Sequence, residues 1–280
     1  MAKPKGFSIR IFLPEGSDGL RIVEKSNWTG LGVMCPRGMF HSAKARPEFS
    51  KTGVYLLTGP PSDSGLPLVY VGEGDPVGPR LENHMAKKDF WTSLIFFTSK
   101  DENLNKAHAK HLEARLLRIA RAAKRCDLDN ASQPELPSLS EAEGADVDAF
   151  LDEMLLCLPI LGLNIFEMPT GLPPEAKLLH LKAKGLEAQG YESREGFVVL
   201  AGSKASATEA PSIHRYLSQL RTGLVGNELL RQEGSHLVLS QDYEFGSPST
   251  AAGVMLGRSA NGRTSWRDDH GKTLKQLQSG

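Results

Sequence analysis

Apolar residues in the first hundred positions fall into short runs separated by turn residues, a pattern typical of β-strands. Apolar side chains alternate from Phe7 to Leu13, and a second strand is predicted over 20–23. The apolar runs at 54–57 and 68–71 flank a segment rich in Gly, Pro, Ser and Asp, which predicts a β-hairpin. A further strand is predicted over 90–97.

Apolar residues spaced three to four positions apart predict the longer helices. One covers 104–125, and a second covers 140–158 and opens with a Ser-x-x-Glu capping box. A shorter helix is expected to begin near Pro79 and to carry Arg80 and His84 one turn apart.

Glu113 is the one acidic residue of the predicted helix 104–125, and it falls on the apolar side of that helix. A carboxylate among apolar side chains costs several kcal/mol unless a cation or hydrogen bonds accompany it. An ion pair, for example with Arg80, and a bound metal ion are the two interpretations that this position leaves open.

The pattern predicts an α+β protein in several parts. Residues 1–48 form a β-rich N-terminal extension, which either adds strands to the next unit or contacts a partner. Residues 49–165 form a unit with a small antiparallel sheet flanked by helices. The Pro- and Gly-rich stretch 166–176 is the best linker, and a second α+β unit is expected over 177–280.

Composition limits the classes of protein that the chain can represent. Its 280 residues are 40% hydrophobic, enough for a substantial core, and 33 basic residues balance 33 acidic ones. Any surface for a polyanion must therefore be a local patch. The longest apolar run, 154–165, is too short to span a bilayer, which needs ~20 residues.

Three widely spaced cysteines, Cys35, Cys126 and Cys157, argue against a disulfide framework or a Cys-rich zinc site. The first residues, Met1–Lys5, lead into no long apolar segment, so no signal peptide is expected. Both observations favour a reducing, cytoplasmic location.

Six positions occur in a characteristic order along the first half of the chain: Gly53-Val54-Tyr55, Tyr70-Val71-Gly72, Arg80, His84, Glu113 and Asn130. This ordered set resembles the GIY-YIG nuclease family. The similarity covers roughly 51–130, although the segment between the two tripeptides is longer than is usual in that family.

The resemblance implies a Mg²⁺-dependent (or Mn²⁺-dependent) endonuclease that hydrolyses DNA. Glu113 would hold the metal ion, and Arg80 would stabilise developing charge. One of Tyr55 and Tyr70, with Tyr55 favoured, would act as general base or proton relay, and the other would orient the phosphate. His84 would take a proton near neutral pH, since an unperturbed imidazole has a pKa of ~6.5.

The remaining expectations concern Asn130 and the substrate. Asn130 would orient a component of the site by hydrogen bonds. A single cutting centre per chain makes a homodimer plausible for double-strand cleavage. The competing interpretation is a nucleic-acid-binding or scaffolding protein that keeps the fold without cutting, and an RNA substrate is also open. Candidate nucleic-acid contacts are Lys51, Lys87, Lys88, Lys110 and Arg121.

Residues 180–275 resemble an uncharacterised C-terminal domain that accompanies nuclease units of this type, which implies no chemistry of its own. A recognition or partner-binding surface is one interpretation, and a plain α+β module with Trp266 in its core is the other. The first rests on the expected exposure of Arg258, Asn261, Arg263, Trp266 and Arg267.

Overall fold

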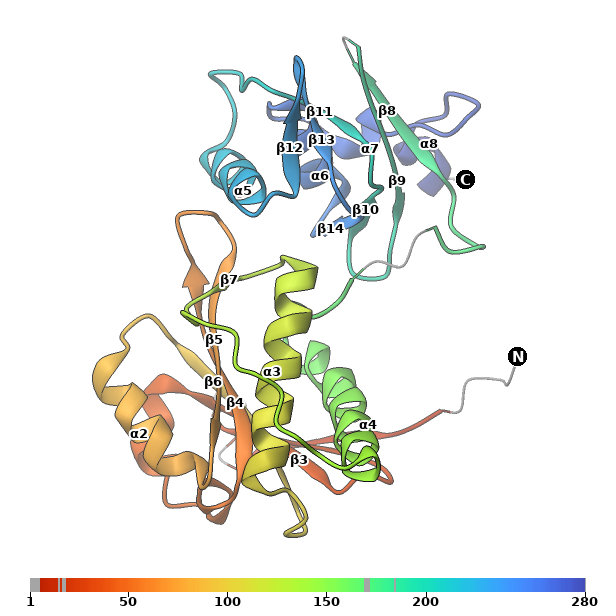
Figure 1. Ribbon diagram of the computed structural model, residues 1–280. Coiled ribbons are helices and arrows are strands. Elements are labelled where there is room, and N and C mark those ends of the chain that lie inside the picture. The colour runs from red at the N-terminus through yellow and green to blue at the C-terminus, as the bar shows by residue number, and fades with distance from the viewer. Residues whose placement is uncertain (1–5, 15, 17–18, 169–171, 184, 280) are drawn as a thin grey trace. The chain divides into compact units, whose positions relative to one another are not determined.

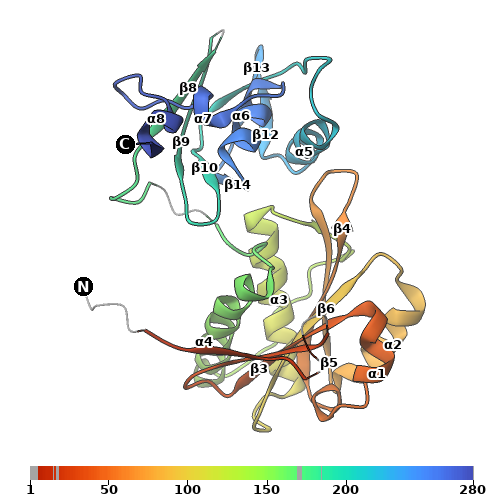
Figure 2. The same ribbon diagram turned by 180° about the vertical axis from the view of Figure 1, so that it is seen from behind.

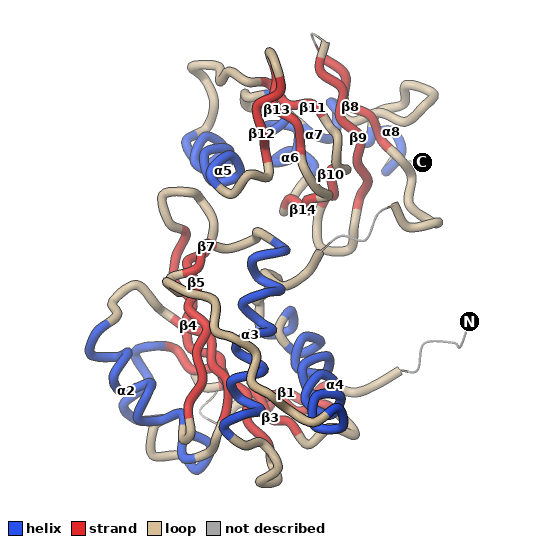
Figure 3. The backbone as a smooth tube through the Cα atoms, in the orientation of Figure 1, coloured by secondary structure: helices blue, strands red, loops and turns tan. Residues whose placement is uncertain are grey.

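The computed structural model describes residues 6–14, 16, 19–168, 172–183 and 185–279 and has the predicted α+β class (Figure 1). Helices and strands occur in both halves of the chain (Figure 3). The chain forms two compact units, one of residues 1–60 and 67–166 and the other of residues 61–66 and 167–280. The predicted linker 166–176 contains residues 169–171, and these, like Met1–Lys5 at the N-terminus, lie outside the described residues.

A seven-stranded sheet, in the order β1-β2-β3-β6-β4-β5-β7, organises the first unit. The strands pair antiparallel from β1 through β2 and β3 to β6, and β6 pairs antiparallel with β4, whereas β7 joins β5 in parallel. The strands are β1 (Ile9–Phe12), β2 (Arg21–Lys25), β3 (Gly30–Pro36), β4 (Gly53–Pro61), β5 (Pro67–Gly74), β6 (Ser93–Ser99) and β7 (Asp127–Leu128).

The N-terminal residues extend this sheet, which is the first of the two roles that the sequence left open for 1–48. β3 pairs with β6 along its whole length, from Gly30 opposite Ser99 to Pro36 opposite Ser93. The reason lies in β6, where the residues from Leu94 to Thr98 are all buried. A strand buried on both faces needs a neighbour on each side, and β3 and β4 supply them.

Helices cover both faces of the sheet, and the alternation along β4 shows how. Val54 and Leu56 pack into the core under α3 and α4, whereas Tyr55 and Leu57 pack into the core under α2. Figures 1 and 2 show α3 and α4 side by side. The helical segments of this unit are η1 (Arg37–Met39), α1 (Phe40–Ala43), η2 (Pro47–Ser50), α2 (Val77–Lys87), α3 (Lys106–Ala123), α4 (Glu141–Cys157) and η3 (Pro159–Leu161).

Local signals set the ends of the long helices. Ser140 and Glu143 form the predicted capping box at the start of α4. Asn105 caps α3 by accepting backbone N–H groups, and α3 ends at Lys124, which has a left-handed φ of 53°. The strand predicted over 90–97 corresponds to β6, which covers 93–99. Thr92 lies just before it and donates its N–H to the carbonyl of Thr58 at 2.8 Å.

The second unit contains two sheets, in the orders β14-β10-β9-β8 and β11-β13-β12. Ser247 caps α6 by accepting the N–H of Thr250 at 3.1 Å. The elements are β8 (Leu179–Ala183), β9 (Leu186–Glu192), β10 (Phe197–Val199), β11 (Lys204–Ser206), α5 (Arg215–Gly226), β12 (Leu230–Glu233), β13 (His236–Leu239), β14 (Tyr243–Phe245), α6 (Pro248–Leu256), α7 (Gly262–Ser265) and α8 (Leu274–Gln278).

Trp266 belongs to the core of this unit, so the expectation that it is exposed was wrong. Its ring centroid lies 4.5 Å from that of Phe197, and its Nε1 donates to the carbonyl of Pro248 at 3.0 Å. A buried indole whose N–H finds a fixed acceptor contributes apolar area without an unsatisfied donor. Asn261, also expected at a recognition surface, caps α7 by accepting the N–H of Arg263.

Within the described ranges, no helix has the length and apolar character needed to cross a bilayer. Cys35, Cys126 and Cys157 are all buried, and none of them is in a disulfide bond in the described part of the chain.

We expect Gly72→Ala to destabilise the first unit, because a Cβ at this position would lie 2.5 Å from Oη of Tyr55. Such overpacking costs about 1–3 kcal/mol, which urea denaturation would measure. Gly144→Ala, inside α4 with no atom within 4 Å of the new Cβ, is the matched control. That control should gain up to about 1 kcal/mol from helix propensity, and equal losses in both variants would contradict the packing argument.

Candidate functional site

Three of the residues singled out in the sequence meet on the α2 side of the sheet. Tyr55 lies on β4, Tyr70 on β5 and His84 on α2. The Tyr70 and His84 ring centroids are 4.8 Å apart, and those of the two tyrosines are 6.3 Å apart. Oη of Tyr55 lies 2.8 Å from Nε2 of His84. The sheet and α2 are therefore joined through their chemically active side chains.

Two glycines lie at positions of this region where any side chain would clash with a neighbouring group. Gly72 follows Tyr70 by two positions, and the Tyr55 ring occupies the volume that a side chain there would need. Gly53 precedes Tyr55 by two, and a Cβ on it would lie 2.3 Å from the carbonyl oxygen of Phe97. The tripeptides Gly53-Val54-Tyr55 and Tyr70-Val71-Gly72 thus have a steric reason in this fold.

Burial keeps both phenols in the neutral form. Tyr55 is fully buried, and burial raises its pKa, with the neighbouring Tyr70 adding to the effect. Tyr70 is half-buried, and its pKa is raised by burial and then by the charge of Glu113. Arg80 lowers the pKa of both phenols, as expected from its charge, but burial outweighs it.

His84 is a neutral imidazole at pH 7. Partial burial lowers its pKa to about 4, and the positive charges of Lys88 and Arg80 act in the same direction. Nε2 can then accept the Tyr55 O–H, which requires the ring proton on Nδ1. The hydrogen bond therefore runs from the phenol of Tyr55 to the imidazole of His84.

The C-terminal end of α2 is held by Arg37, from the N-terminal segment. One guanidinium nitrogen donates to the carbonyl of Lys88 at 2.7 Å, and the other donates to the carbonyl of Met85 at 3.2 Å. The guanidinium also lies 4.4 Å from the centre of the Trp91 ring. A cation that bonds the last carbonyls of a helix complements both unsatisfied acceptors and the helix dipole. Arg37 thus fixes the turn that carries His84.

Lys88 and Asn130 support Tyr70 from two sides. Nζ of Lys88 lies 4.4 Å from the Tyr70 ring centre and pairs with Asp129. Oδ1 of Asn130 accepts the N–H of Val71 at 2.9 Å, and Nδ2 donates to the Val71 carbonyl at 2.8 Å. The amide continues the ladder past the short β7 and holds β5 directly after Tyr70. Asn130 was expected to orient a component of the site by hydrogen bonds, and the bonds that it makes are to the backbone of Val71.

Glu113 is a half-buried carboxylate in the field of the same group. Burial raises its pKa to about 7, the charge of Glu73 adds to the rise, and Arg80 and Lys110 oppose it. Within the described residues, Glu113 has no cationic nitrogen within 4.0 Å, so the expected alternative of an ion pair with the exposed Arg80 is not formed. Its charge still reaches the phenols, since it raises the pKa of Tyr70 and of Tyr55.

Glu73 was missed in the sequence. Strand alternation could have found it, because Val69 and Val71 pack against α3, and Glu73 is the next residue in that row. Glu113 lies on α3, whereas the two tyrosines and His84 meet on the α2 side of the sheet. Glu113 therefore acts on the phenols and on Glu73 through its charge, and the described residues show no hydrogen bond between it and those three side chains.

The donor set suits a hard divalent cation. The described residues contain no group of three or more His, Cys, Asp and Glu side chains suited to a metal ion. A single carboxylate whose pKa is raised beside a second one gains from a cation, and Mg²⁺ binds through one or two carboxylates and several waters. The residues present therefore fit Mg²⁺ or Mn²⁺ at Glu113, with Glu73 nearby.

The predicted nucleic-acid contacts differ in whether their side chains already bond to other groups of the protein. Lys51 donates to the carbonyls of Ser99 at 2.9 Å and Lys100 at 3.0 Å, so it caps the end of β6. Lys88 is engaged as described above, and Arg121 bonds Gln133. Lys87 and Lys110 are exposed.

One comparison with known proteins gives a result. A family described as "Domain of unknown function (DUF4357)" matches residues 179–278, in the second unit. No curated protein and no solved structure shows significant similarity to the chain. The candidate site lies in the first unit, outside the matched residues.

Glu113→Gln should change how stability depends on pH. The ordinary pKa of 4.5 rises to about 7 on folding, so between these values the folded chain binds more protons than the unfolded one. The wild-type free energy of unfolding should therefore fall as pH rises through this range, by on the order of 1–2 kcal/mol after allowance for partial exposure. Urea denaturation in EDTA from pH 4.5 to 8 measures it.

Glu113→Gln should lack this loss, and Mg²⁺ should stabilise the wild type more than the variant at pH 8. Glu135→Gln, at an exposed carboxylate, is the control and should behave like the wild type. Parallel pH profiles for wild type and Glu113→Gln would contradict the raised pKa.

Arg37→Ala should destabilise the first unit by about 1–3 kcal/mol, because two carbonyls at the end of α2 lose a charged donor. Lys44→Ala also removes a cation that pairs with α2, through Glu82, but that pair is exposed and should cost less than about 1 kcal/mol. Thermal and urea denaturation compare the two, and equal losses would show that Arg37 is an ordinary surface cation.

Proposed function

We propose that the first unit is an endonuclease of the GIY-YIG type, which hydrolyses DNA phosphodiester bonds with one divalent cation at Glu113. The observation that carries this proposal is the hydrogen-bonded pair of Tyr55 and His84 packed against Tyr70. These residues come from two strands and a helix, and packing alone does not require a phenol, an imidazole and a second phenol at one point.

The reaction joins the oxygen of a water molecule to phosphorus and breaks the bond from phosphorus to the leaving oxygen. The proton of the attacking water passes to Oη of Tyr55, while the phenolic proton of Tyr55 moves to Nε2 of His84. The neutral His84 can accept it, and the leaving oxygen takes a proton from solvent. Tyr55 is thus a relay rather than a phenolate base, because burial raises its pKa.

The other residues act on the phosphate. Tyr70 is half-buried and can donate its O–H to a phosphate oxygen, while the exposed Arg80 can bind the phosphate with two N–H groups. A cation held by Glu113 would supply further neutralisation of the transition-state charge. Asn130 and Arg37 are positioning residues, since their bonds are to the backbone of β5 and α2.

A nucleic-acid-binding protein that does not cut is the second candidate. The complete burial of Tyr55 favours it, because a relay must reach the attacking water. A binding protein would keep Arg80 and the exposed Lys87 and Lys110 for the backbone without needing that access. Catalysis is the test that separates the two.

With Mg²⁺, the purified protein should nick supercoiled plasmid DNA, and EDTA should stop the reaction. Glu113→Ala and Arg80→Ala should each lower the rate by about 100-fold or more, because each removes charge that stabilises the transition state. Gel assays of the nicked product measure the rates. Lys44→Ala removes an exposed cation outside the site, and this variant should cut like the wild type.

Three outcomes bear on the alternatives. Equal, metal-independent background cutting by all variants, together with DNA binding, would favour the binding protein. A linear product that rises with the square of protein concentration would support a homodimer, since each chain has one proposed centre, and faster cleavage of RNA would redirect the substrate class.

A further inference from the structure

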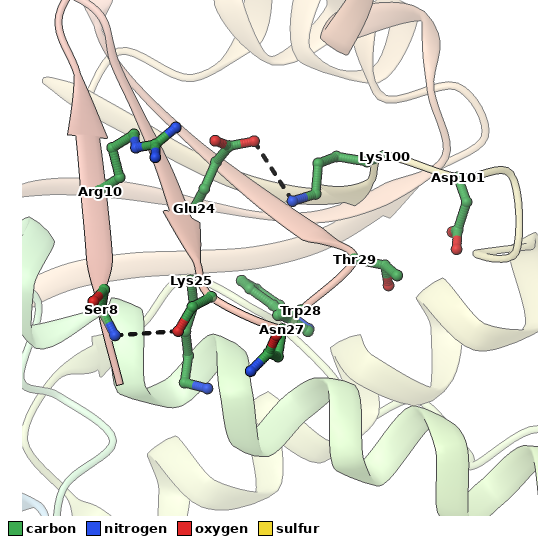
Figure 4. A pocket seen from close by; sticks show the side chains of 10 residues that line it. Ser8, Arg10, Glu24, Lys25, Asn27, Trp28, Thr29, Lys100 and Asp101 are labelled. Carbon is green, nitrogen blue, oxygen red and sulfur yellow. Dashed lines mark hydrogen bonds and ion pairs between the residues drawn. The ribbon is translucent and has the colours of Figure 1, made fainter. Parts of the chain in front are cut away.

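A pocket of about 690 Å³ opens beside the N-terminal strands, at residues that the proposed cutting site does not use (Figure 4). Its lining comes from Ser8 and Arg10 at β1, from residues 24–29 at the end of β2 and in the turn into β3, and from Lys100 and Asp101 after β6. This volume is within the range of small-molecule and cofactor sites, roughly 300–1,000 Å³.

The charges in the lining leave one cation available. Lys25 pairs with Glu153 at 2.8 Å, and Lys100 approaches Glu24 at 3.6 Å. Asp101 accepts a hydrogen bond from Ser99. Arg10 is exposed and, although Glu24 is its partner in the strand register, it has no carboxylate within 4.0 Å among the described residues. An anion beside Arg10 would therefore gain a partner without breaking an ion pair.

Trp28 supplies a rigid wall and an unused donor. Its side chain is 9% exposed, and its ring lies 5.0 Å from Phe150 and 6.2 Å from Phe97. A Cβ at position 30 would lie 2.1 Å from the indole, so the ring can occupy this volume because residue 30 is a glycine. Nε1 has no acceptor among the described residues, and an unsatisfied buried donor is costly.

We propose that this pocket binds a nucleotide unit, with its phosphate on Arg10 and its remaining polar groups toward Trp28 and the hydroxyl of Thr29. The proposal deepens the proposed function and rests on it, since the unit would be part of the nucleic acid that the protein cuts. The free nucleotide has the same chemistry and is distinguished by the experiment. The N-terminal strands then contribute a second contact to the backbone, separate from Arg80.

The experiment measures the affinity for a fluorescein-labelled single strand of about 20 nucleotides by anisotropy, in EDTA so that nothing is cut. Arg10→Gln should weaken binding about fivefold and reduce the slope of log affinity against log salt by about 0.7, as expected for one lost phosphate contact. Arg194→Gln, at an exposed arginine outside the pocket, is the matched control and should change neither value. Arg10→Lys should restore most of the affinity.

A second measurement titrates dAMP into the protein and follows the indole N–H signal of Trp28 by NMR, assigned with Trp28→Phe. A shift with dAMP and a loss of strand affinity in Arg10→Gln support the pocket as a contact for the strand. A shift with dAMP and an unchanged strand affinity assign the pocket to free nucleotide.

No shift together with unchanged affinity and salt slope in Arg10→Gln overturns the proposal, whether or not the protein cuts DNA. These readouts do not need cleavage, so failure of the nuclease assay with a positive result here would remove the proposed function and leave the pocket.

Discussion

The hydrogen bond between Oη of Tyr55 and Nε2 of His84 is the constraint on which the rest of the candidate site depends. It joins β4 to α2 across the core under that helix, and it is possible only because Gly72 leaves the Tyr55 ring its space. Arg37 then secures the end of α2, and Asn130 secures β5 beside it. Each of these contacts fixes backbone rather than a substrate-facing atom. Residues that are distant in the sequence therefore hold Tyr55 and His84 in position.

Two titrating groups of the site respond to folding in opposite directions. Folding lowers the pKa of His84 to about 4, so its contribution to stability is lost as pH falls from about 6.5. Folding raises the pKa of Glu113 to about 7, so its contribution is lost as pH rises. Both shifts favour the neutral form of the side chain, so folding places fewer charges in this partly buried region. The proposed cation and phosphate would give Glu113 and Arg80 charged partners, and neither residue has an ion pair in the described part of the chain.

The sequence predicted features that depend on near neighbours and missed those that depend on distant ones. The hairpin strands, α3 and the capping box at Ser140 follow from periodicity and local hydrogen bonds. The pairing of β3 with β6, the carbonyls that hold Lys51, and the burial of Trp266 bring together residues that local patterns do not connect. The residues of the candidate site were named in advance from a family pattern, but Glu73 and Arg37 were not. Glu73 owes its role to its place on β5, and Arg37 owes its role to its bonds with the end of α2. Only the assembled fold defines these two positions.

The N-terminal segment explains why the site cannot be read from residues 49–165 alone. Without β3, the buried side chains of β6 from Leu94 to Thr98 would lie on an open sheet edge. Without Arg37, the last carbonyls of α2 would lose their charged donor, and His84 lies on that turn. Both effects act on β4 and α2, the elements joined by Tyr55 and His84. The extension is therefore structurally part of the candidate site, and a nucleotide contact at Arg10 would place recognition on the same strands that complete the sheet.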